Sequence, residues 1–141
     1  MPDTVPASFA AHPAKVLIVE DEPADLVLWR LAFRHSGVSA HVSFAQDGEE
    51  ALTTLFDERH RFDMVLLDLN LPKVDGKQVL RALRDDSRFD SLPVIVSSSA
   101  CSGGDAAACF RLGANRCLEK PASYPALIAL VRELADTLPG E

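Results

Sequence analysis

Short apolar runs alternate with longer amphipathic stretches along this chain, and this alternation restricts its fold more than any other feature. Unbroken apolar runs at 16–19, 64–67 and 94–96 are typical of strands that are covered on both faces. Segment 40–45 alternates polar and apolar residues, which favours a strand at a sheet edge, and 116–118 is the last short run. Because a helical stretch follows each strand, the order predicts a parallel sheet with helices on both faces.

Cap and turn residues mark where the helices between these strands begin and end. Pro23 suits the first turn of a helix that Gly37 ends. Asp47 caps the next helix, and Gly113 closes a later one. Five strand–helix units predict a flavodoxin-like, doubly wound (βα)5 fold with five parallel strands in the order 2-1-3-4-5. The helices are expected at about 24–36, 47–56, 77–85, 105–112 and 124–138.

Length and charge limit the organisation of the chain and its partners. A chain of 141 residues suits one domain, and we expect a flexible lead-in at 1–14, the domain at 15–138 and a tail at 139–141. The net charge of −7 argues against nucleic acid or an anionic membrane as the main partner. No apolar run is long enough to span a membrane, and the N-terminus does not resemble a signal peptide. We therefore expect a cytoplasmic protein.

The three cysteines support the same compartment. Cys101, Cys109 and Cys117 form an odd set, which predicts reduced thiols in a cytosol. Their even spacing of eight fits no zinc motif, and no histidine lies near them.

Polar residues follow directly on four of the expected strands: Glu20 and Asp21, then Asp68, Ser98 and Lys120. The carboxyl ends of parallel strands lie along one edge of the sheet, where ligands bind, so the fold gathers these residues into one pocket. Three carboxylates in one pocket repel one another, and at least one would tend to hold a proton. Mg²⁺ removes that problem, because it prefers oxygen ligands and commonly takes one or two carboxylates.

This set of groups suits phosphoryl transfer. Asp68 would be a carboxylate nucleophile that attacks phosphorus and forms an acyl phosphate. The metal on one side and Lys120 on the other would stabilise the charge that builds on the phosphoryl oxygens. Ser98 could donate its hydroxyl to one of those oxygens.

Five motifs in this order resemble the receiver domains of bacterial response regulators, over about 15–138. The resemblance implies that Asp68 is the phosphoacceptor, that Ser98 is the switch hydroxyl and that Lys120 binds the phosphoryl group. It also implies that Asp21, Asp68 and the backbone carbonyl of Asn70 bind Mg²⁺, while Glu20 acts through water. The partner would be a sensor histidine kinase, and the chain would be a switch rather than a turnover enzyme. The motifs are Val-Glu-Asp-Glu-Pro-Ala-Asp at 19–25, Leu-Leu-Asp-Leu-Asn-Leu-Pro at 66–72 with Asp75-Gly76, Pro-Val-Ile-Val-Ser-Ser at 93–98, Leu-Gly-Ala-Asn at 112–115, and Lys120-Pro121.

Within that family, the chain is similar to single-domain regulators of phytochrome-type light-sensing kinases. This narrower resemblance implies a homodimer through the final helix, the last strand and the helix before it. One position departs from the family pattern, because the residue three before the lysine is usually aromatic and here is Cys117. A thiol is too small to swing as a ring does, so we predict that Cys117→Tyr changes partner or dimer affinity and leaves phosphorylation of Asp68 intact.

Other interpretations of these residues remain open. Glu20 and Asp21 could simply complement a helix dipole, Lys120 could be a solvated charge, and the serines at 97–99 could form a loop without a role. A haloacid-dehalogenase-type phosphatase also uses a strand-end Asp with Mg²⁺, but it places a second acid where this chain has Asn70. A receiver-like module that never takes phosphate is a third class. A flavodoxin-like flavin carrier would need a phosphate-cradling loop after the first strand.

Overall fold

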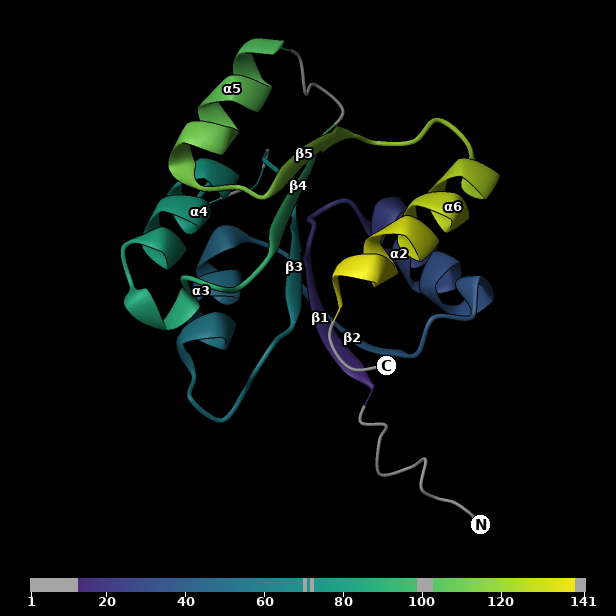
Figure 1. Cartoon of the computed structure of the whole chain (residues 1–141), viewed down its shortest axis with the longest axis horizontal. Helices are drawn as coiled ribbons and strands as arrows, with labels where there is room; N and C mark the ends of the chain where they lie inside the picture. Colours follow the sequence, from purple (N-terminus) through teal and green to yellow (C-terminus); the bar gives the residue numbers. More distant parts are fainter. Residues whose placement is uncertain (1–12, 70, 72, 99–102, 139–141) are drawn as a thin grey trace.

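The computed structural model describes residues 13–69, 71, 73–98 and 103–138, and at 98 and 103–105 it describes the backbone only. Five parallel strands form one sheet in the order β2-β1-β3-β4-β5, which confirms the predicted fold and places β2 at an edge (Figure 1). In the part of the chain described, no helix combines the length and apolar character that crossing a membrane requires. The strands are β1 (Ala14–Val19), β2 (Ala40–Ala45), β3 (Met64–Leu67), β4 (Val94–Ser98) and β5 (Arg116–Glu119), and the helices are α2 (Pro23–Ser36), α3 (Gly48–Phe56), α4 (Gly76–Arg84), α5 (Gly103–Leu112) and α6 (Tyr124–Leu134), with short 3-10 helices η1 (Ser87–Phe89) and η2 (Ala135–Thr137).

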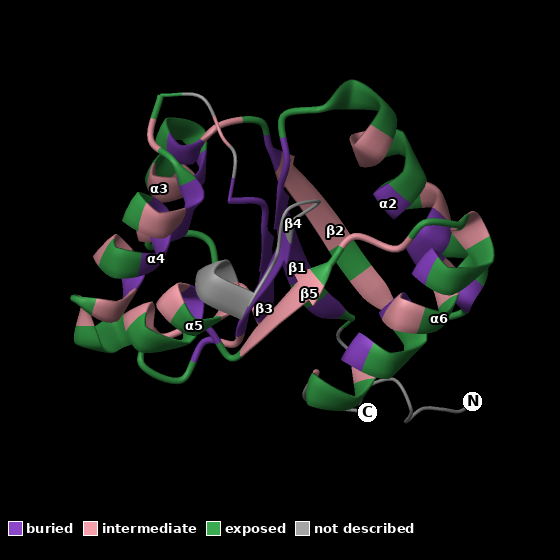
Figure 2. Ribbon diagram, turned by 90° about the horizontal axis from the view of Figure 1, so that it is seen from above, coloured by how far each residue is buried: buried purple, intermediate pink, exposed green. Residues whose placement is uncertain are grey.

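The helices cover both faces of the sheet, with α3, α4 and α5 on one side and α2 and α6 on the other (Figure 1). Alternate residues of each central strand enter the two cores. In β1, Leu17 and Val19 pack in the core with α3, α4 and α5, whereas Val16 and Ile18 pack in the core with α2 and α6. The unbroken apolar runs at 16–19, 64–67 and 94–96 are buried along their whole length, as predicted (Figure 2). Trp29 of α2 is buried in the core with α2 and α6.

The predicted caps are present, and one helix end differs from the prediction. Gly37 ends α2 with a φ of 80°, a conformation that favours glycine. The Asp47 carboxylate accepts a hydrogen bond from the backbone N–H of Glu50 and caps α3. Helix α6 ends at Leu134, short of the predicted 138, because the chain tightens there into the 3-10 turn η2.

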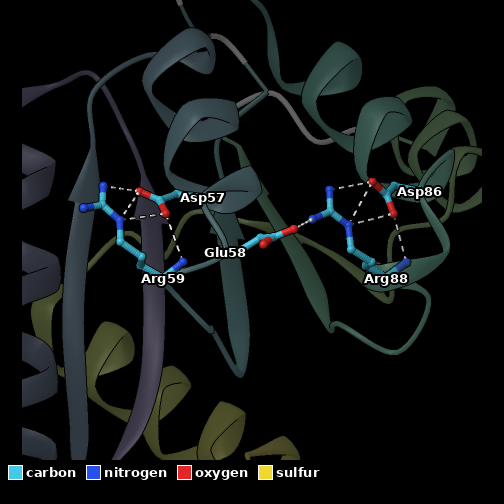
Figure 3. A network of polar contacts seen from close by, with 5 residues as sticks. All are labelled: Asp57, Glu58, Arg59, Asp86 and Arg88. Atoms are coloured by element: carbon cyan, nitrogen blue, oxygen red, sulfur yellow. Dashed lines mark hydrogen bonds and ion pairs between the residues drawn. The ribbon is translucent and has the colours of Figure 1, made fainter.

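A network of exposed ion pairs lies at the amino ends of β3 and β4, the opposite edge from the strand-end acids (Figure 3). Arg88 pairs with Asp86 at 2.8 Å and with Glu58 at 3.8 Å, and its guanidinium lies 5.3 Å from the centres of the Phe56 and Phe89 rings. Exposed pairs of this kind each add little to the free energy of unfolding.

Candidate functional site

The carboxyl ends of three strands bring the predicted acids and the lysine together. Glu20 follows β1, Asp68 follows β3 and Lys120 follows β5. Strands β1 and β3 are neighbours with Val19 opposite Leu67, and the Asp68 backbone N–H donates to the Val19 carbonyl at 3.0 Å. The parallel register therefore fixes Glu20 and Asp68 side by side, as predicted from the position of each residue after its strand.

Lys120 reaches across the strand ends to these acids. Its Nζ lies 2.9 Å from Glu20 Oε1 and 3.3 Å from Asp68 Oδ2. The side chains of Glu20 and Asp68 are only 2% and 7% exposed, so both carboxylates have left most of their water. Desolvated carboxylates need a cation, and Lys120 supplies one positive charge.

Burial raises the pKa of Glu20 to about 7, although the hydrogen bond from Lys120 opposes the rise and the nearby Asp68 charge adds to it. Burial acts to lower the pKa of Lys120, but its hydrogen bonds to Asp25 and Glu20 outweigh that effect and raise it above the ordinary lysine value. Lys120 therefore stays charged at neutral pH, while Glu20 holds a proton more readily than an exposed glutamate does.

The acids also form a group that fits a divalent metal ion. Glu20, Asp21 and Asp68 each offer one carboxylate oxygen, and these oxygens lie within 4.8 Å of one another. Asp21 is exposed and the other two are buried, so the group opens to solvent on one side. Carboxylate oxygens are the donors that hard divalent cations prefer, and an ion there would offset charge that Lys120 alone does not balance.

Gly76, the first residue of α4, lets the helix start close to the backbone of Asp68. A Cβ at Gly76 would lie 2.4 Å from the Asp68 carbonyl oxygen, so the start of α4 packs there only without a side chain. The Gly76 backbone N–H donates to the Leu69 carbonyl at 3.0 Å, and the Asp75 and Gln78 side chains cap the helix beside it. The sequence named Gly76 only in a motif with Asp75, before the helix expected at 77–85, whereas the structure has it close to the backbone of Asp68.

Two predicted site residues lie wholly or partly outside what the structure describes. Asn70 is not among the described residues, so its predicted carbonyl ligand stays a prediction. Ser98 is described in its backbone only, as the last residue of β4 opposite Glu119 rather than the first residue after the strand.

The prediction of three reduced thiols is wrong for Cys117. This residue lies in β5 opposite Val96 and is disulfide-bonded. Cys109 is buried in α5, and Cys101 lies outside the described residues. An odd cysteine count cannot exclude one bonded pair, which is why composition alone misled the prediction.

One acid at the site was not predicted. Asp25, in the first turn of α2, places Oδ2 at 2.9 Å from Lys120 Nζ, as close as Glu20 comes. The motif at 19–25 contains this residue, but no role followed from the motif. Its position two residues after Pro23 could have predicted its place at the site. The first turn of the helix that follows β1 lies next to the carboxyl ends of the strands.

The fold and the site together define a receiver: a 2-1-3-4-5 parallel sheet with an acidic group and a lysine at its carboxyl edge. Residues 16–132 match the family model of the response regulator receiver domain, and the chain belongs to that family.

Relatives of known name agree with this assignment. FilR2, a probable methanogenesis regulatory protein of Methanothrix harundinacea, is 34% identical over 131 residues, which cover 90% of this chain and 84% of FilR2. The chain spans about half the length of several other curated relatives that are named response regulators.

Two solved structures are close in fold. Phosphorylated RcpA, a cyanobacterial phytochrome response regulator, matches with a TM-score of 0.81 and 33% identity, over 91% of this chain and 94% of RcpA. The Mn²⁺-bound form of Rcp1, a response regulator of Synechocystis, matches with a TM-score of 0.79 and 29% identity, over 90% of this chain and 99% of Rcp1.

Proposed function

We propose that this chain is a phosphoacceptor switch of a two-component system, which takes a phosphoryl group from a sensor histidine kinase onto Asp68. The observation that carries the proposal is the approach of Lys120 Nζ to 3.3 Å from the Asp68 carboxylate, beside two further acids. Membership of the receiver family supports the same role. The receiver unit is taken as residues 15–138, with 1–14 and 139–141 as its flanks.

The transfer uses groups of known chemistry. An Asp68 carboxylate oxygen forms a bond to phosphorus while the phosphorus–nitrogen bond of the kinase's phosphohistidine breaks. The imidazole nitrogen keeps the electron pair and takes up a proton. Lys120 lies beside the Asp68 carboxylate, where the phosphoryl group is added, and balances negative charge on the phosphoryl oxygens. Mg²⁺ bound by Asp21, Asp68 and the Asn70 carbonyl, with Glu20 acting through water, would balance the rest of that charge.

The response to phosphorylation is the next part of the proposal. Ser98 donates its hydroxyl to a phosphoryl oxygen, and its loop moves towards Asp68. Val96 and Cys117 are opposite each other in β4 and β5, so a shift of β4 reaches Cys117 directly. Because Cys117 is disulfide-bonded, Cys117→Tyr also removes a cross-link, and its effect on affinity is best compared with that of Cys117→Ser.

The partners proposed are a phytochrome-type kinase and a second copy of the chain, in the cytoplasm. The similarity in fold to RcpA, a phytochrome response regulator, supports the proposal of a phytochrome-type kinase as partner. The dimer face comprises α5, β5 and α6, where Phe110 is 52% exposed. Tyr124 and Ile128 of α6 are partly buried against the core, so they contribute less surface to this face than Phe110 does. A large exposed aromatic suits the centre of an interface, so Phe110→Ser should weaken dimerisation of the phosphorylated chain without slowing phosphorylation.

A small phosphodonor tests the central claim without the kinase. Incubation with acetyl phosphate and Mg²⁺ should add one phosphoryl group per chain by intact mass, and sizing in the same buffer reports the dimer. Asp68→Asn should abolish the gain, and the matched control Asp136→Asn, an exposed acid of η2, should keep it. A gain that persists in Asp68→Asn would refute the assignment, and continued release of phosphate from small esters would favour the phosphatase instead.

A further inference from the structure

Lys120 is shared among acids that belong to different elements. Glu20 and Asp68 follow neighbouring strands, whereas Asp25 belongs to the first turn of α2, on the far side of the first loop. Nζ lies 2.9 Å from Asp25 and Glu20 and 3.3 Å from Asp68, and an ammonium has three protons to donate. Of these three contacts, the one with Asp68 is the longest, and Asp68 is the residue to which the phosphoryl group would be added.

Asp25 differs from the other acids in exposure and in what it touches. Its side chain is 31% exposed, against 2% for Glu20 and 7% for Asp68. It is not among the three acids whose oxygens form the metal-sized group. Among the described residues, Asp25 contacts the site through the hydrogen bond from Lys120, which makes Lys120 the route by which Asp25 can influence Asp68.

We infer that Asp25 is a positioning residue that competes with the phosphoryl group for Lys120. In the unphosphorylated chain Asp25 stabilises the ammonium near α2. A phosphoryl group on Asp68 adds acceptor oxygens beside the same ammonium, so Lys120 must leave Asp25 or share its protons. The contact between Asp25 and Lys120 thus stabilises the unphosphorylated state and restrains phosphorylation. This inference rests on the proposed function of Asp68.

The test compares three variants in phosphorylation by acetyl phosphate, followed by decay of the phosphorylated form. Asp25→Asn keeps the shape and removes the competing charge, and we expect phosphorylation about two- to fivefold faster, as suits a partly exposed ion pair. The acyl phosphate should also decay more slowly by a similar factor, because Lys120 is free to stay with it. Asp25→Glu restores the carboxylate and should return both rates towards those of the wild type.

Glu22→Gln is the matched control for charge. Glu22 precedes α2, is exposed, and its side chain makes no cap hydrogen bond. The Glu22→Gln substitution removes the same charge from the same end of α2 and leaves Lys120 unchanged. Its rates of phosphorylation and of acyl phosphate decay should therefore stay within about 1.5-fold of the wild type. Thermal unfolding of each variant shows that the fold is kept.

The outcomes separate this inference from the proposed function. Equal acceleration by Asp25→Asn and Glu22→Gln would show a general effect of charge on an anionic donor and overturn the competition. Unchanged or slower phosphorylation of Asp25→Asn, with the wild type phosphorylated normally, would overturn it too and leave the role of Asp68 standing. A wild-type chain that takes no phosphoryl group would refute both.

Discussion

At the scale of single residues, Ser97 is the polar side chain whose surroundings are hardest to reconcile with stability. It lies in β4, is 3% exposed, and its hydroxyl has no hydrogen-bond partner among the described residues. A buried hydroxyl without a partner loses its hydration without compensation. The sequence treated Ser97 as part of a serine run and gave no sign of this cost.

We expect Ser97→Ala to raise the free energy of unfolding by roughly 1 kcal/mol, because it removes the unpaired hydroxyl and leaves only a small void. Urea unfolding of the unphosphorylated chain measures the change. Ser91→Ala, at an exposed position before β4, should change stability by less than about 0.5 kcal/mol. A lower free energy of unfolding in Ser97→Ala would show that the Ser97 hydroxyl forms a hydrogen bond in the folded chain.

Cys117 gives a second prediction at the residue scale. Because it is disulfide-bonded, it should resist alkylation in protein that is unfolded without a reductant, whereas Cys109 should react once unfolding exposes it. Peptide mass mapping before and after reduction distinguishes the two. Alkylation of Cys117 without a reductant would restore the original prediction of a reduced thiol.

At the scale of secondary-structure elements, one arginine joins four segments that also pack in the same core. Arg84, the last residue of α4, donates to the carbonyls of Gly113, Phe89 and Leu92 and to the Asn115 side chain. These acceptors belong to η1, to the approach to β4 and to the turn before β5. Partial burial lowers the pKa of Arg84 from the ordinary arginine value.

Arg84→Gln should lower the free energy of unfolding by about 2–3 kcal/mol, since several charge-assisted hydrogen bonds are lost and carbonyls are left without donors. Denaturant unfolding with an unchanged m-value would measure this as a change of stability alone. Arg81→Gln, one turn earlier in α4 and exposed, is the matched control and should cost less than about 0.5 kcal/mol. Equal effects of the two variants would show that Arg84 acts only through net charge.

At the scale of the whole molecule, stability should depend on pH through the buried acid at the site. The carboxyl of Glu20 ionises near pH 4.5 in an unfolded chain, and burial raises its pKa to about 7 in the folded chain. Between these values the folded chain holds a proton that the unfolded chain has released. The free energy of unfolding contributed by Glu20 therefore falls as pH rises through that window.

Glu20→Gln removes this ionisation, so without divalent cations its stability relative to the wild type should rise by about 1–3 kcal/mol between about pH 5 and about pH 8. Urea unfolding in a chelator at several pH values measures the trend. Glu49→Gln, an exposed acid in the first turn of α3, should show no such trend. Saturating Mg²⁺ should reduce or reverse the advantage of Glu20→Gln, because the ion stabilises the ionised site only in the folded chain. A difference independent of pH would contradict the raised pKa.

The sequence by itself determined the strand order, the edge position of β2 and the grouping of Asp21, Asp68 and Lys120. The edge position follows from the side-chain period of β2, and the order follows from the flavodoxin-like fold that five strand–helix units predict. The grouping follows because parallel strands end at one edge of the sheet. Only the tertiary structure decided that α6 ends at Leu134, that Arg84 joins four segments and that Asp25 holds Lys120. Those features depend on how helices far apart in sequence pack against the sheet and on which conformers their side chains adopt. No local sequence pattern determines either of these.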